Sequence, residues 1–170
     1  MRHEEAKDLL AAVADLKEKG DKASIAKLRY GERPSRRIAA AEVIGRWYYP
    51  HSEAELTLIA AFLAAFVRND FVSAEGRSLS GAVFTMESGI SAPRLFNRLI
   101  SSASTEELAG VVPGVLRRLS AEGIAVDYAA GLCDAVNFNL DPEGIVLRWM
   151  QAANREKNRE KLAARKEAAK

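Results

Sequence analysis

The chain has few of the residues on which catalytic and metal-binding proteins depend. It contains one cysteine and two histidines, and neither His3 nor His51 has a cysteine, histidine or carboxylate neighbour at ligand spacing. This argues against a zinc or di-metal site. No glycine-rich loop with a following lysine and no dinucleotide-binding glycine fingerprint occurs. We therefore expect no cofactor, no metal and no small-molecule substrate.

The carboxylates also lack a catalytic arrangement. The adjacent pairs Glu4/Glu5 and Glu106/Glu107 fall in the first turns of expected helices, where acidic side chains interact favourably with the helix dipole. Nuclease chemistry would need clustered acids that hold Mg²⁺, and the sequence offers no such cluster. The sequence thus predicts that the protein is not an enzyme.

Disulfide and membrane signals are absent too. The single Cys133 has no partner for an internal disulfide, which is typical of a reducing cytoplasm. The N-terminus has no apolar signal core, and the longest apolar run, residues 56–67, is interrupted by Thr57. That run is well short of the ~20 residues that a membrane span needs. We expect a soluble cytoplasmic protein with no membrane contact.

Positive charge is present but unevenly distributed. The net charge is only +2, yet residues 22–46 carry seven cations against two acids, and residues 155–170 carry seven against three. Acids are concentrated near the start of the chain and around residues 53–55. Such polarity is typical of a protein that binds a polyanion on one face, although a solvated surface of mixed charge would explain it equally well.

Apolar periodicity is helical nearly everywhere, so the fold class is predicted to be all-α. We expect a compact bundle of about eight helices in one structural domain with two small lobes. The lobes span residues 1–70 and 71–154, divided at the polar loop 69–77, and a basic, frayed helical tail follows over 155–170. Expected helices span residues 4–19 and 127–138; others pass through residues 25–28 and 38–48 or begin at Ser52, at Ser78 or Ser80, at Ser91, at Ser104 and at Asp141.

Local signals refine these helices. Ser52 with Glu55 and Ser104 with Glu107 have the spacing of capping boxes. Pro113 should break or kink its helix near Gly110, because proline removes a backbone hydrogen bond and clashes with the preceding turn. Trp47 and Trp149 could stack on bases, but both fall on apolar helix stripes, and core packing is the better interpretation.

The most informative segment runs from Arg77 to Arg118. Arg94 and Arg98 are four residues apart, so they lie one above the other on one helix face. Leu95, Phe96, Leu99 and Ile100 take the opposite, apolar side. Cations stacked on a solvated face with no acids beside them suit a row of phosphates.

At this level of detail the chain resembles the CasB family, the small subunit of the type I-E CRISPR surveillance complex called Cascade. The resemblance is carried by short segments in order over about residues 22–150: Lys27-Leu-Arg29, Gly76-Arg-Ser-Leu-Ser-Gly-Ala82, Arg94-Leu-Phe-Asn-Arg-Leu-Ile100, Val115-Leu-Arg-Arg-Leu119, Val126-Asp-Tyr128 and Val146-Leu-Arg-Trp149. No single segment is specific; their order and spacing carry the resemblance.

The resemblance implies a helical protein that is present in two copies inside Cascade. There it would lie against the other subunits, which carry the guide RNA, and contact a second copy of itself. Its basic surface would hold the displaced single-stranded DNA and so stabilise the R-loop. In an R-loop, an RNA–DNA duplex replaces a DNA duplex of about the same stability. Modest protein contacts to the strand backbone can therefore shift the equilibrium toward the R-loop.

The residues implied in this nucleic-acid binding come partly from the resemblance and partly from local charge. The family segments give Arg29, Arg94, Arg117 and Arg118, with weaker support for Lys27, Arg98 and Arg148. The basic stretch 22–46 adds Arg36 and Arg37. The chain departs from some relatives at 137–141, where Asn-Phe-Asn-Leu-Asp replaces a more basic stretch.

Two other interpretations remain open. A helix-turn-helix regulator would need a recognition helix with a polar, basic N-terminus, and the helix from Pro93 begins with mostly apolar turns. A helical scaffold subunit would use the same arginines to contact protein partners. Reversing their charge would then break assembly but leave strand binding intact.

Overall fold

The computed structural model describes residues 1–86 and 91–168, and this part of the chain is helical without strands. Its helices are α1 (His3–Glu18), α2 (Lys22–Arg29), η1 (Pro34–Arg36), α3 (Arg37–Ile44), α4 (Glu53–Arg68), α5 (Leu79–Phe84), α6 (Ser91–Ile100), α7 (Thr105–Ala121), α8 (Tyr128–Val136), η2 (Phe138–Leu140) and α9 (Pro142–Ala168). The all-α prediction is confirmed. The nine α-helices of the described part compare with about eight expected.

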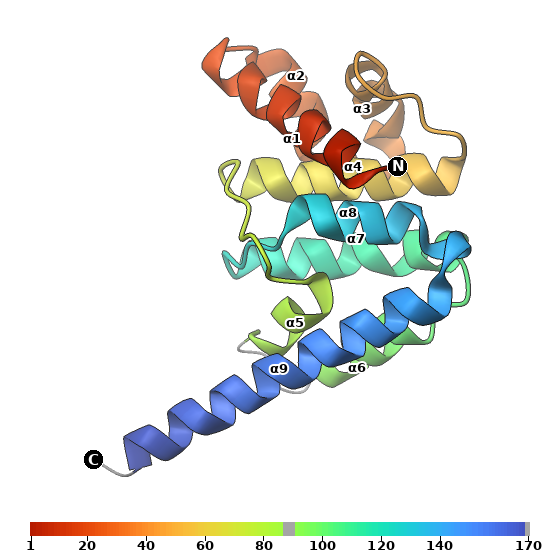
Figure 1. Ribbon diagram of the computed structural model, residues 1–170. Helices are drawn as coiled ribbons and strands as arrows, with labels where there is room; N and C mark the ends of the chain where they lie inside the picture. The colour runs from red at the N-terminus through yellow and green to blue at the C-terminus, as the bar shows by residue number, and fades with distance from the viewer. Residues whose placement is uncertain (87–90, 169–170) are drawn as a thin grey trace.

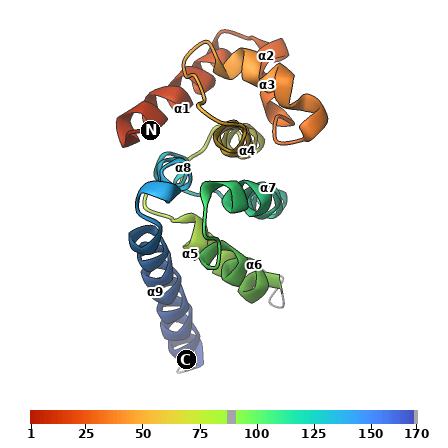
Figure 2. The ribbon, with the colours of Figure 1, turned by 90° about the vertical axis from the view of Figure 1, so that its right-hand side faces the viewer.

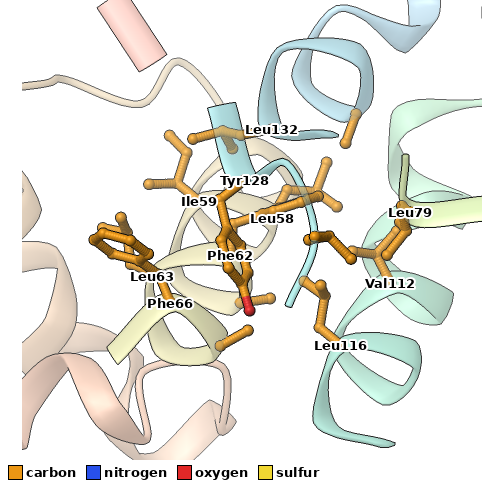
Figure 3. Packing of buried hydrophobic residues seen from close by; sticks show 14 of the residues in the cluster. Leu58, Ile59, Phe62, Leu63, Phe66, Leu79, Val112, Leu116, Tyr128 and Leu132 are labelled. Carbon is orange, nitrogen blue, oxygen red and sulfur yellow. The ribbon is translucent and has the colours of Figure 1, made fainter. Parts of the chain in front are cut away.

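Helix α4 is the centre of the core. Every residue from Leu58 to Val67 is buried, and the helix packs chiefly against α7, with α2, α3 and α8 around it. Figure 3 shows Phe62 and Leu58 of α4 among side chains from α5, α7 and α8. A helix that is apolar on all sides must be enclosed on all sides, which explains the central position of α4.

The other helices are arranged above and below α4. In Figure 1, α1, α2 and α3 lie above it, α7 and α8 lie below it, and α5, α6 and α9 form the lowest part. Contacts cross residue 70, since α1 packs on α8 and α4 packs on α7. Helix α9 extends away from the body toward the C-terminus (Figures 1 and 2).

The helix starts follow from the capping residues. Ser52, Ser104 and Asp127 each accept a hydrogen bond from the backbone N–H three residues ahead. Such caps satisfy a backbone donor that has no partner inside the helix. Asp141 does the same for Gly144 before Pro142 begins α9. These starts were predictable because capping is a local interaction.

Two glycines allow close approach of elements. A Cβ at Gly31 would lie 2.6 Å from the Cβ of Ala40, and a Cβ at Gly131 would lie 2.8 Å from the ring of Phe62. Gly31 thus lets the turn after α2 pack on α3, and Gly131 lets α8 pack on α4. Any side chain at either position would force the two elements apart.

Three expectations can be compared with the structure. The helix at 38–48 ends at Ile44, so Trp47 leaves the apolar stripe and is 39% exposed, whereas Trp149 is buried as expected. Helix α7 is unbroken although Pro113 lies inside it, because its apolar stripe, including Val112 and Leu116, is held in the core. The tail continues α9 as helix through Ala168.

Candidate nucleic-acid interface

The helices that carry most of the predicted binding residues share one side of the molecule. In Figure 2, α2, α3, α7 and α6 follow one another down the right-hand side, while α1, α8 and α9 lie on the left. Contacts of α4 with α2, α3 and α7, and of α7 with α6, hold these helices together. We call the exposed surface of α2, η1, α3, α6 and α7 the basic face.

Several cations of the basic face are exposed and lack an acidic partner. Within residues 1–86 and 91–168, no ion pair is formed by the following exposed side chains: Arg29, Arg36, Arg94, Arg98 and Arg118. Tertiary folding thus brings unpaired guanidinium groups from far apart in the sequence to one side. None of these five groups has a carboxylate partner among the described residues, which favours the attraction of a polyanion.

The geometry of α6 agrees with the amphipathic pattern of its sequence. Arg94 and Arg98 are exposed, whereas Leu99 is fully buried. The ring of Phe96 packs 4.9 Å, centroid to centroid, from the ring of Phe84 in α5. Because this packing fixes the rotation of α6, both arginines project from the bundle.

A buried carboxylate links the turn after α2 to helices α4 and α7. The Glu32 side chain, in the turn after α2, is 1% exposed and lies 2.8 Å from Arg68 Nη2 and 3.8 Å from Arg117 Nε. Neither Glu32 oxygen accepts a well-directed hydrogen bond within the described residues. Glu32 therefore holds α4 and α7 against this turn by charge. Arg117, at 57% exposed, is only loosely held.

Two of the predicted residues on the basic face are paired with acids. Lys27 Nζ lies 2.8 Å from Glu42 Oε2, and this hydrogen bond lowers the pKa of the Glu42 carboxyl. Arg37 donates to Glu53 at 2.9 Å, and the Arg37 side chain is only 18% exposed. These two cations are less available to a ligand than their neighbours.

Arg148 lies apart from the others. It is carried by α9, where its guanidinium lies 2.9 Å from Asp134 Oδ1 and 3.5 Å from Asp141 Oδ2. The hydrogen bond from Arg148 to Asp134 raises the pKa of Arg148. Trp149 Nε1 donates to the other oxygen of Asp134 at 3.0 Å. Arg148 is thus part of the α8–α9 junction and does not join the basic face.

The described residues offer no sign of chemistry beyond charge. No group of three or more histidine, cysteine or acidic side chains that could hold a metal is found among them. Burial raises the pKa of the Cys133 thiol, which disfavours the reactive thiolate. None of the helices described is long and apolar enough to cross a membrane.

Comparison with known proteins identifies the family. The family model of the CRISPR-associated protein Cse2 matches residues 21–152 of the chain. The chain belongs to the Cse2 family. Cse2, also called CasB, is a structural subunit of the type I-E CRISPR Cascade complex, and its members are generally non-catalytic. The resemblance inferred from the short arginine-leucine segments is confirmed.

The fold agrees with this membership. The crystal structure of CasB from Thermobifida fusca is similar with a TM-score of 0.59, covering 87% of this chain and 94% of that one at 13% sequence identity. No curated protein sequence matches the chain. At so low an identity the structural match shows that this Cse2 chain has the CasB fold, and nothing more.

Sequence reasoning missed several residues in or near the basic face. It overlooked Glu32 and Arg68, whose burial depends on contact between segments far apart in the chain. It also passed over Arg33, whose guanidinium lies 4.8 Å from the ring centroid of Tyr30. Glu32 lies in the turn between α2 and η1. This glutamate, enclosed by arginines, gave no local signal.

Proposed function

We propose that this protein is the non-catalytic small subunit that holds the displaced non-target DNA strand on its basic face. In this role it stabilises the R-loop of Cascade. The binding residues are Arg29, Arg36, Arg94, Arg98 and Arg118. Arg117, which lies beside Glu32, contributes as well. Two copies of the subunit lie beside the other subunits and their guide RNA.

The gathering of unpaired guanidinium groups on one side supports this proposal most strongly. Five exposed arginines from three separate segments lie on elements that share that side. A protein that needed only solubility would pair such groups with acids, as the chain does at Lys27 and Arg148. Membership in the Cse2 family supports the proposal, because a Cascade subunit would meet a displaced single strand if the complex forms an R-loop.

Binding rests on electrostatics without base recognition. Each arginine that neutralises a phosphate releases condensed counterions, so the logarithm of affinity falls with the logarithm of salt by about 0.7 per contact for a single strand. Roughly five contacts give weak binding by one free subunit at physiological salt. Affinity then rises through tethering in the complex, which increases the effective concentration of the strand.

The test is fluorescence anisotropy of a labelled, mixed-sequence single strand over a salt series. The triple variant Arg29→Gln, Arg94→Gln, Arg118→Gln removes one charge from each segment of the face. We expect weaker binding and a salt slope smaller by about 2, the sum of three phosphate contacts. Scrambling the strand sequence should leave the affinity unchanged.

A matched control removes the same charge from another side. Lys7 and Lys17 lie on α1 and Lys19 caps its C-terminal end, and each is ion-paired with an acid in the structure. The control variant Lys7→Gln, Lys17→Gln, Lys19→Gln should keep most of the wild-type slope. Equal losses in the two triple variants would overturn the proposal, because net charge alone would then govern binding.

The same variants separate strand binding from a scaffold role. If the arginines contact protein partners, the Arg29/Arg94/Arg118 variant will fail to assemble with the other Cascade subunits. An assembled complex that contains this variant but loses protection of the displaced strand supports our proposal. A sequence-specific footprint on duplex DNA would instead favour a helix-turn-helix regulator.

A further inference from the structure

A second basic site lies away from the basic face, between the loop before α5 and the middle of α9. A pocket of about 210 Å³ opens there, and it is lined by Gly76, Ser78, Ala152, Arg155, Glu156 and Arg159. Helices α5 and α9 pack against each other, and Figure 1 shows α5 beside the middle of α9. None of the lining residues belongs to α2, α3, α6 or α7.

The walls of this pocket are held firmly by contacts on both sides. Ser80 Oγ, which is buried, donates to the carbonyl of Trp149 at 2.9 Å and joins α5 to α9. Gly81 allows the close approach, since a Cβ there would lie 3.2 Å from Glu156 Cγ. On the loop side, the Gly76 N–H donates to Asp127 Oδ2 at 2.9 Å. The pocket is therefore a built feature of the fold.

The charge of the pocket is positive. Arg155 and Arg159 are four residues apart on α9, so they project from one helix face. The exposed Arg77 lies in sequence between two lining residues, Gly76 and Ser78. The one acid of the wall, Glu156, lies 3.0 Å from Arg159 Nη1 and neutralises it in part.

The donors available in the pocket are guanidinium groups. The Ser78 hydroxyl accepts from the Gly81 N–H at 3.0 Å and is 3.2 Å from Ser80 Oγ. Because Ser80 gives its proton to Trp149, Ser78 must give its own to Ser80. The ligand is then recognised by arginine forks, which match the paired oxygens of a phosphate group.

We propose that this α5–α9 pocket binds a phosphate group. The group comes either from a nucleic-acid phosphodiester or from free phosphate, because both present the same oxygens. The site is separate from the basic face and does not depend on strand binding there. It gives a role to Arg77 and to the basic start of the tail, which the basic face leaves unused.

The test follows backbone amides of the full-length protein by NMR at constant ionic strength. Inorganic phosphate and a thymidine trinucleotide are titrated separately. We expect concentration-dependent shifts at residues 76–81 and 152–159 with both probes, and the trinucleotide should add separate shifts on the basic face. Shifts at lower trinucleotide than phosphate concentration identify a phosphodiester as the ligand, and the reverse order identifies free phosphate.

Matched variants make the result specific. The variant Arg155→Gln, Arg159→Gln should lose the pocket shifts. The variant Arg94→Gln, Arg98→Gln removes an arginine pair of the same spacing from α6 and should keep them. Glu156→Gln removes the competing carboxylate, so phosphate should bind roughly fivefold more tightly, as expected for loss of one exposed ion pair.

The gain in Glu156→Gln protects the test from a folding artefact, because a damaged pocket would weaken binding. Absence of shifts at residues 76–81 and 152–159 with both probes would overturn the proposal. So would pocket shifts that persist in the Arg155→Gln, Arg159→Gln variant, since the two guanidinium groups of the pocket would then not be their source. Neither outcome bears on strand binding by Arg29, Arg94 and Arg118.

Discussion

Two regions of the molecule carry arginines in nearly the same local sequence and treat them differently. Arg118 follows Val-Leu-Arg in α7, and Arg148 follows Val-Leu in α9. Arg118 is exposed and forms no ion pair within the described residues, whereas Arg148 is bound by Asp134 and Asp141. The count of cations in a sequence therefore overstates the charge that a polyanion can use.

The basic face itself shows the same contrast between its surface and its interior. Beneath the exposed arginines, Glu32 is buried against Arg68 and lies 3.8 Å from Arg117. This single acid lies between cations of two helices, Arg68 of α4 and Arg117 of α7. Glu32 holds the helices of the face together, while the unpaired arginines attract phosphate.

The largest expected effect comes from removing that acid. Glu32→Ala leaves Arg68, whose side chain is 19% exposed, without a partner in a mostly dry site, and should lower the free energy of unfolding by about 3 kcal/mol. Urea unfolding measures it. Glu42→Ala, which removes the exposed partner of the exposed Lys27, should cost less than about 1 kcal/mol. Similar losses in the two variants would show that the burial of Glu32 does not matter.

A smaller effect distinguishes the two arginines directly. Arg118→Gln should reduce the salt slope of strand binding by about 0.7, the value of one phosphate contact. Arg148→Gln should leave the slope unchanged, because Asp134 and Asp141 already occupy its guanidinium. Anisotropy over a salt series measures both. A smaller salt slope in both variants would place Arg148 in the interface, and the proposed difference between Arg118 and Arg148 would be wrong.

The smallest effect concerns an exposed pair. The hydrogen bond from Lys27 holds the pKa of Glu42 below its ordinary value, so Lys27→Gln should raise it toward that value. Carbon-13 NMR of the carboxyl group measures the shift. Since the folded state lowers this pKa, the small stabilisation is present above the ordinary pKa and disappears as the pH falls through the lowered one. An unchanged pKa would mean that Lys27 is free to bind phosphate.

Local sequence predicted where the helices lie in the chain better than it predicted how they pack. The cap at Ser52 and the apolar run that follows it gave α4 and its burial, because capping and periodicity act within one segment. Trp47 was misplaced because apolar periodicity does not show that α3 ends at Ile44. Pro113 was expected to break α7, but packing against α4 outweighs the lost hydrogen bond.

For the candidate site too, the sequence predicted local features but not the contacts between distant segments. That Arg94 and Arg98 share an exposed face followed from their spacing and from the apolar residues opposite them. That Lys27, Arg37 and Arg148 are ion-paired did not follow, since the acids that they hydrogen-bond lie 14 to 16 residues away in sequence. The α5–α9 pocket was equally hidden, because it joins residue 76 to residue 159.

By itself the sequence determined an all-helical protein with one long apolar helix, local excesses of basic residues and a family membership visible in the order of short segments. These properties are local or additive, so composition, periodicity and spacing record them. Only the tertiary structure decided which cations share a side, which ones acids neutralise and where a pocket forms. Those properties depend on distances between segments remote in sequence, and such distances are set by how the helices pack.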